Sequence, residues 1–201
     1  MKELLVDTLL FEVSPDLVTE AIAGNKPLIV TGILQRADAK NQNRRVYPRP
    51  ILERESQKYA DTQVRERRAL GELDHRESSV VNLNNVSHNV RKMWWEANNL
   101  LGEVEILGTP AGNILKELFR AGIKLGISSR GLGSVKPDNE NYNVVQEDFE
   151  LIAFDFVSNP STQGAFMYPG SLNEGIDPYQ AQITAKYARV NRIITEILSG
   201  E

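Results

Sequence analysis

Two histidines, His75 and His88, supply all the imidazole in the 201 residues, and the chain has no cysteine. Imidazole is the usual general base near neutral pH, so acid–base chemistry in this chain depends on one of these two side chains. The lack of cysteine excludes disulfides, thiolate metal sites and a cysteine nucleophile. A lone histidine is commonly structural, so each needs a neighbouring nucleophile and acid before it predicts catalysis.

The candidate nucleophile lies in Leu125–Ser134, whose letters are LGISSRGLGS. A serine hydroxyl attacks a carbonyl only after a base takes its proton, and acyl transfer also needs N–H donors aimed at the developing oxyanion. The glycines of the segment let the backbone approach a substrate closely. The alternative is a Gly/Ser-rich turn without chemistry. A phosphate loop is excluded, because no Gly-Lys-Ser/Thr follows Gly133.

The same segment nearly matches the Gly-x-Ser-x-Gly elbow of α/β-hydrolases, with the second glycine one residue late. Those enzymes run in the order serine, acid, histidine, whereas both histidines here precede the serine. The chain is also short for a full doubly wound hydrolase. Both observations argue against that fold.

Asp155 is the candidate acid, because it stands between Phe154 and Phe156. A carboxylate among large apolar residues needs a partner inside a protein, and an imidazolium would serve. The alternative places Asp155 on the solvated face of an alternating strand.

A metal site is the weaker interpretation of the same residues. Glu72, Asp74, His75 and His88 could supply ligands, but no His-Glu-x-x-His spacing exists and the histidines are far apart in sequence. We therefore expect no metal and no cofactor. The net charge of −4 does not predict nucleic-acid binding. The N-terminus is a poor signal peptide and no apolar run approaches about 20 residues, so we expect a soluble, cytoplasmic protein.

The elements that must position these residues form a mixed pattern. Strands are expected over residues 2–13, 26–34 and 149–157, with a hairpin whose arms are 91–95 and 100–107. Helices are expected over residues 51–64, 110–120 and 178–197. This order predicts an α+β fold with a barrel or sandwich core.

The chain resembles the prohead core proteases of large contractile-tailed phages and, more distantly, herpesvirus assemblins. Five segments carry the resemblance: Asn43–Pro48, Ala69–His75, Met93–Trp95, Gly126–Ser134 and the strand that holds Asp155. The Gly-Glu-Leu-x-His and Gly-x-Ser-Ser-Arg-Gly-Leu-Gly-Ser segments, in this order and spacing, are the specific part. The resemblance implies an assemblin-like distorted β-barrel decorated with helices. The matching segments lie within an expected catalytic domain, residues 1–172, and span most of it. An amphipathic C-terminal helix is expected at residues 173–201.

The resemblance also implies roles for single residues. His75 falls on the base and Ser128 on the nucleophile, with Ser129 as the alternative nucleophile because Ser129-Arg130-Gly131 fits the Ser-x-Gly of distant relatives. Asp155 falls on the third member of the triad. The backbone N–H groups of Ser129, Arg130 and Gly131 are expected to form the oxyanion hole, where Arg130 either adds charge or pairs with an acid. His88 lies outside the motifs and keeps its structural interpretation.

The function that the resemblance implies is a serine endopeptidase that cleaves scaffold, core and capsid proteins after glutamate during prohead maturation. It would act inside the immature prohead in the host cytoplasm, as a homo-oligomer that binds neither nucleic acid nor membrane. The resemblance also implies a preference for Leu or Ile two residues before that glutamate. Leu10-Phe11-Glu12 and Ile194-Thr195-Glu196 fit this pattern and suggest self-cleavage. The alternative function is a catalytically silent structural or scaffold-binding component of a phage particle.

Overall fold

The structure is a computed structural model, and it describes residues 2–11, 13, 15–24, 26–41, 43–74, 78–138, 141–158 and 167–169. The chain divides into a unit Met1–Gly170 and a unit Ser171–Glu201, and every described residue belongs to the first. The expected boundary at 172 and the expected C-terminal helix lie outside the described residues and stay predictions.

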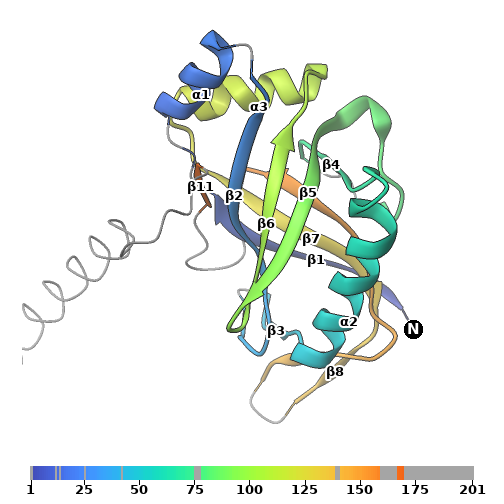
Figure 1. Ribbon diagram of the computed structural model, residues 1–201. Helices are drawn as coiled ribbons and strands as arrows, with labels where there is room; N and C mark the ends of the chain where they lie inside the picture. Colours follow the sequence, from blue (N-terminus) through green and yellow to red (C-terminus); the bar gives the residue numbers. More distant parts are fainter. Residues whose placement is uncertain are drawn as a thin grey trace, which may run out of the picture. The chain divides into compact units, whose positions relative to one another are not determined.

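A five-stranded antiparallel sheet forms one layer, in the order β11-β2-β6-β5-β4 (Figure 1). Its strands are β2 (Leu28–Arg36), β4 (Leu70–Glu72), β5 (Val86–Glu96), β6 (Asn99–Ile106) and β11 (Met167–Pro169). The β5–β6 hairpin turns at Ala97-Asn98, with Glu96 opposite Asn99. This is the hairpin that the sequence predicts, and its first arm extends back past His88.

A three-stranded antiparallel sheet, β1-β7-β10, runs across the first sheet (Figure 1). Its strands are β1 (Glu3–Phe11), β7 (Leu125–Gly133) and β10 (Glu150–Val157). The Gly/Ser-rich segment is therefore the central strand of a sheet, and the turn interpretation is wrong. Its small residues suit that place: a Cβ on Gly131 would stand 2.6 Å from the backbone oxygen of Glu150.

Helices and a small third sheet complete the described fold. The third sheet joins β3 (Arg45–Val46), β9 (Asn143–Val145) and β8 (Val135–Pro137). The helices are α1 (Pro15–Ala23), α2 (Arg49–Tyr59), which continues as a π-helical turn over Ala60–Val64, α3 (Pro110–Arg120) and a 3₁₀ turn, Leu83–Asn85. Thr109 caps α3, since its hydroxyl accepts a hydrogen bond from the N–H of Gly112 at 3.1 Å. The sequence analysis did not anticipate α1.

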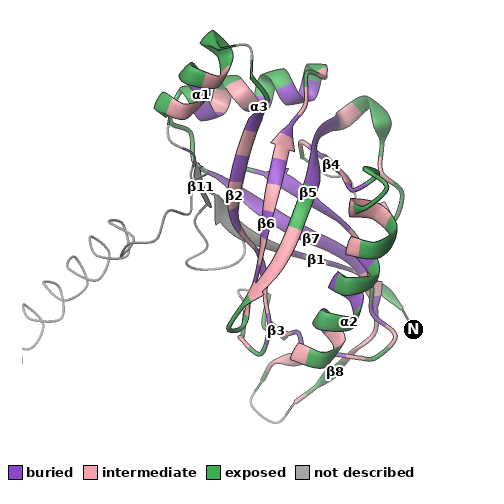
Figure 2. Ribbon diagram, in the orientation of Figure 1, coloured by how far each residue is buried: buried purple, intermediate pink, exposed green. Residues whose placement is uncertain are grey.

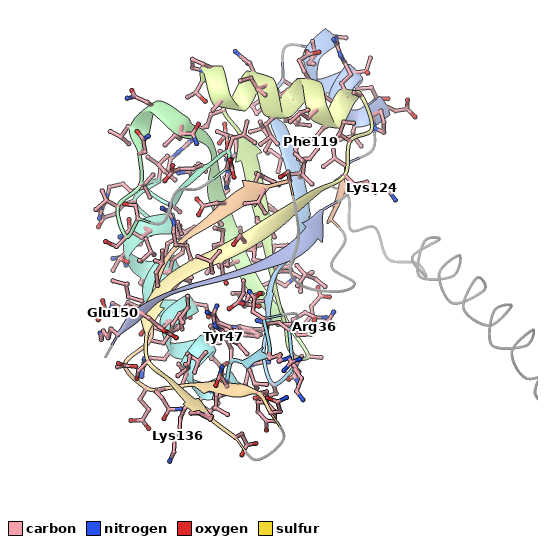
Figure 3. All side chains as sticks on the ribbon, turned by 180° about the vertical axis from the view of Figure 1, so that it is seen from behind. Arg36, Tyr47, Phe119, Lys124, Lys136 and Glu150 are labelled. Carbon is pink, nitrogen blue, oxygen red and sulfur yellow. The ribbon has the colours of Figure 1, made fainter. Side chains whose placement is uncertain are left out.

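The main apolar core lies between the two larger sheets. Val30 and Val104 face it from one sheet, and Ile127, Phe154 and Phe156 face it from the other. Figure 2 shows the buried stretches of the crossing strands, while the outer faces of α1 and α3 are exposed. Phe119 of α3, labelled in Figure 3, also packs into this core.

The α+β class is confirmed, with a difference in the core. The sheets over the described residues are open, and none closes into a barrel. The larger sheets meet at one corner, where a bridge between Leu73 and Phe156 joins the end of β4 to β10. None of the helices in the described ranges is both long and apolar enough to cross a bilayer.

Candidate active site

Ser128 lies in the middle of β7, directly opposite Asp155 of β10. Directly opposed residues of antiparallel strands project to the same face, so both side chains share one side of this sheet. Both are fully buried. The Ser128 hydroxyl has no hydrogen-bond partner within the part of the chain that the structure describes. A buried hydroxyl without a partner is uncommon, and it leaves Ser128 able to donate to a base.

Ser129 projects to the opposite face of β7, because side chains alternate along a strand. There its hydroxyl accepts a hydrogen bond from Gln35 Nε2 of β2 at 2.6 Å. It therefore faces the five-stranded sheet, away from Ser128 and Asp155. The two candidate nucleophiles lie in different environments, and the hydroxyl of Ser129 is already engaged.

A buried polar network surrounds Ser129. Asp7 lies opposite it on β1, and the carboxylate of Asp7 accepts hydrogen bonds from the Tyr47 hydroxyl and from Asn43 Nδ2. Burial raises the pKa of the Asp7 carboxyl, and burial beside that carboxyl raises the pKa of Tyr47 well above its usual value. Tyr47 is labelled in Figure 3. Asn43 and Tyr47 of the Asn43–Pro48 segment thus bind Asp7 of β1, which lies beside Ser129 of β7.

Arg130, two residues after Ser128 on the same face, is fully buried among carboxylates. Its Nε lies 2.9 Å from Asp155 Oδ2, and its Nη2 donates to Asp155 Oδ1 at 3.1 Å and to Glu72 Oε1 at 2.9 Å. Its Nη1 donates to the backbone oxygen of Ser78 at 2.9 Å. Of the two roles expected for Arg130, the structure shows pairing with acids.

Asp155 is held by Arg130 and by the backbone of β4, whereas the imidazole expected beside it, that of His75, lies outside the described residues, so that pairing stays a prediction. Besides the guanidinium of Arg130, its Oδ1 accepts a hydrogen bond from the backbone N–H of Glu72 at 2.9 Å. The alternative of a solvated strand face is wrong, because Asp155 is fully buried. Two carboxylates, Asp155 and Glu72, face one guanidinium in this cluster.

His75 lies outside the described residues, so its distance to Ser128 stays a prediction. The chain just before it is described. The backbone N–H of Asp74 donates to the oxygen of Phe156 at 2.7 Å, and Phe156 follows Asp155 on β10. Consecutive Cα atoms are 3.8 Å apart, so the attachment point of the His75 segment is beside the end of β10.

His88 is a structural residue. Its ring is fully buried on β5, with Nδ1 2.8 Å from the Ser87 hydroxyl and Nε2 2.9 Å from the backbone oxygen of Phe154. Burial lowers its pKa to about 4, so the ring is neutral at pH 7. Both ring nitrogens are occupied, which removes His88 from the metal site considered above. No group of three His, Asp or Glu side chains suited to a metal occurs among the residues that the structure describes.

The expected oxyanion donors, the N–H groups of Ser129, Arg130 and Gly131, belong to a strand that pairs on both sides. β1 and β10 flank these residues. Central strands use their N–H groups in the ladder, so these donors would reach an oxyanion only where a ladder opens. Their role stays a prediction.

Sequence reasoning missed Glu72 as a member of this cluster. It was considered only as a possible metal ligand, although the motif that contains His75 also contains Glu72. Arg130 was the residue that could have indicated this role of Glu72. A guanidinium beside a buried strand needs carboxylates, and Glu72 supplies one of them. Gln35, the partner of Ser129, carried no comparable signal.

Comparisons with known proteins identify the family. A family model described as prohead core protein serine protease matches residues 8–177. The prohead core protein protease of Enterobacteria phage T4 is 37% identical over 155 residues, which cover 75% of this chain and 73% of that protein. The solved structure of the bacteriophage T4 capsid assembly protease, gp21, matches with a TM-score of 0.69 and 29% identity, covering 79% of this chain and 99% of that one. The chain therefore belongs to the family of prohead core protein serine proteases.

Proposed function

We propose that this chain is a serine endopeptidase that cleaves scaffold, core and capsid proteins during prohead maturation, with Ser128 as its nucleophile. One observation carries the assignment of the nucleophile: the Ser128 hydroxyl is buried on the same strand face as Asp155 and has no hydrogen-bond partner among the described residues. Ser129 offers a hydroxyl that already accepts from Gln35, on the other face. Family membership supports the reaction class.

The mechanism follows from these roles. His75 takes the proton of the Ser128 hydroxyl while Oγ attacks the peptide carbonyl, and the tetrahedral intermediate collapses to an acyl-enzyme as His75 protonates the leaving amine. Water, deprotonated by His75, then attacks the ester and releases the new carboxyl terminus. No metal or cofactor takes part in this scheme.

Asp155 is the proposed third member. The cluster holds two carboxylates against one guanidinium, so a second cation would be stabilised beside it. The imidazolium that forms on His75 during attack is such a cation. Asp155, fixed by Arg130 and by the N–H of Glu72, would favour it without moving.

A peptide must also reach the nucleophile. Ser128 is fully buried, so attack requires that substrate binding or a movement of the covering chain expose its hydroxyl. Ser128 lies on the face of β7 opposite Ile127, which packs into the main core, and access therefore does not require that core to open.

Cleavage after glutamate, homo-oligomerisation and action inside the prohead extend the proposal beyond the family assignment. Of the two triplets for self-cleavage, Leu10-Phe11-Glu12 begins within β1, where Leu10 pairs with Gly126 of β7. A protease needs an extended, free segment, so cleavage there requires β1 to leave the sheet. Ile194-Thr195-Glu196 lies outside the described residues.

The decisive experiment is co-expression with the cognate scaffold and capsid proteins, read by intact mass. Wild type should cleave them after glutamates. Ser128→Ala should lose turnover by on the order of a millionfold, because the acyl-enzyme cannot form. Ser129→Ala is the matched control and should retain cleavage, because it removes a hydroxyl that faces Gln35.

Other outcomes would change the proposal. Loss of cleavage only in Ser129→Ala would keep the protease and move the nucleophile by one residue. A wild type that cleaves nothing in assembled shells, and that no serine-directed probe labels, would favour the silent structural component.

A further inference from the structure

The buried guanidinium of Arg130 touches both sides of the chain segment that contains His75. Glu72 precedes His75 by three residues and Ser78 follows it by three, and Arg130 binds both. We propose that Arg130 is a positioning residue of the protease, which fixes the His75 segment against the strand that carries Ser128. This inference rests on the proposed function.

The side chain of Arg130 links three strands, β7, β4 and β10, to the loop residue Ser78. Its own strand carries Ser128 two residues earlier, on the same face. Nη2 binds Glu72 at the end of β4, Nη1 binds the Ser78 carbonyl at 2.9 Å, and Nε and Nη2 bind Asp155 of β10. The guanidinium therefore joins the proposed nucleophile strand to the entry and the exit of the segment between Glu72 and Ser78.

Glu72 extends this attachment. Its Oε1, which accepts from Arg130, also accepts a hydrogen bond from the backbone N–H of Asn82 at 3.0 Å. The carboxylate is 2% exposed, so water does not replace these donors. Removing the Glu72 carboxylate would release two contacts at once while leaving Arg130 paired with Asp155.

Backbone bonds hold the approach to His75. The N–H of Leu73 donates to the Asn85 oxygen at 3.0 Å, and Asn85 Nδ2 donates to the oxygen of Asp74 at 2.7 Å. Between Asp74 and Ser78 the chain has three residues, hence four Cα–Cα links of 3.8 Å. With Asp74 bound to β10 and Ser78 bound to Arg130, both ends of that short connection are set relative to Ser128.

Arginine suits this role and lysine does not. Guanidinium presents five donors in a planar fork, so it can serve Glu72, Asp155 and the Ser78 carbonyl together. Lysine concentrates three donors on one nitrogen and cannot span the same acceptors. Arg130→Lys keeps the positive charge and loses the planar fork of donors. The variant therefore separates the effect of positioning from that of charge.

The test measures labelling by a fluorophosphonate probe per folded molecule, with kcat and KM for cleavage of a scaffold substrate. Arg130→Lys and Glu72→Ala should each label at least tenfold more slowly and lose kcat with KM within threefold of wild type. Their labelling should also lose the sigmoidal pH dependence that titration of a histidine base gives wild type. Glu72→Gln keeps Oε1 as an acceptor and should restore labelling to within threefold of wild type.

The matched control is Glu55→Ala. Glu55, on α2, is 4% exposed and accepts hydrogen bonds from Arg54 Nε at 2.9 Å and from the N–H of Leu151 at 3.3 Å. Within the described residues, its hydrogen bonds and ion pairs involve neither Arg130 nor a residue that Arg130 binds. It should label at the wild-type rate per folded molecule. This control separates the loss of any buried carboxylate from the loss of Glu72.

Each outcome is decisive. If wild type does not label, the proposed function fails before this inference is reached. If wild type labels and the folded fractions of Arg130→Lys and Glu72→Ala label equally fast, the positioning role is overturned and the cluster only stabilises the fold. If Arg130→Lys does not fold, the contrast between Glu72→Ala and Glu72→Gln decides, and equal slowing of both would overturn the inference.

Discussion

The side chains of adjacent residues on β7 lie in two different chemical environments, one on each face of the strand. Ser128 and Arg130 project to the face with Asp155, while Ser129 projects toward Gln35 and the Asp7–Tyr47 pair. The strand period of two makes this division, since adjacent residues point to opposite faces. Ser128 and Ser129, which the sequence leaves as alternative nucleophiles, therefore lie on opposite faces of the sheet.

His88 makes stability depend on pH through its buried neutral ring. Its pKa falls from 6.5 to about 4 on folding, so the unfolded chain binds a proton first as the pH drops. The free energy of unfolding should therefore fall between pH 6.5 and 4, with His88 contributing a loss of about 3 kcal/mol at pH 4. Urea unfolding of wild type and His88→Gln across this range measures it.

The variant should lack this part of the pH dependence, so the stability advantage of wild type should shrink as the pH falls. Asp7 acts in the opposite direction, because its raised pKa makes folding take up a proton, but it is present in both proteins and cancels in the comparison. A constant difference between the two proteins across the range would contradict the neutral, buried His88.

At the scale of elements, β7 is the strand that holds the proposed site together. It pairs with β1 and β10 along its length, so its neighbours must approach closely on both sides. Glycine permits this where a side chain would collide. A Cβ on Gly131 would stand 2.4 Å from a ring carbon of Phe149 as well as close to the Glu150 oxygen.

Gly131→Ala should therefore destabilise the protein by about 3 kcal/mol, because the backbone of Glu150 cannot yield as a flexible side chain can. Chemical denaturation measures the change. Gly108→Ala is the matched control: a Cβ there meets nothing within 4 Å, so its stability should stay within about 0.5 kcal/mol of wild type. Equal stability of the two variants would show that β10 can shift away from β7.

At the scale of the molecule, the unit Met1–Gly170 contains all the described contacts of the proposed site. Its last described strand, β11, pairs with Val30–Gly32 of β2. A truncated chain that keeps this pairing must therefore extend at least to Pro169. The expected catalytic domain ends close to this point, at residue 172.

A chain that ends at Gly170 should fold and react with a serine-directed probe at the wild-type rate, with a Tm within a few degrees of the full chain. Thermal unfolding and probe labelling test this directly. Loss of folding in this shortened chain would show that residues 171–201 belong to the catalytic domain, against the predicted division.

The sequence by itself determined the family, the α+β class and the segments that contain Ser128, Asp155 and His75, because motif order and apolar periodicity are local signals. It also predicted the hairpin, α3 and most of β10. It did not determine that the Gly/Ser-rich segment is a strand, since small residues are typical of turns and a central strand is stable only with partners on both sides. Only the tertiary structure decided that Ser128 stands opposite Asp155 and that Arg130 reaches Asp155 and Glu72, because the pairing of β7 with β10 and the approach of β4 bring together residues that are far apart in the sequence.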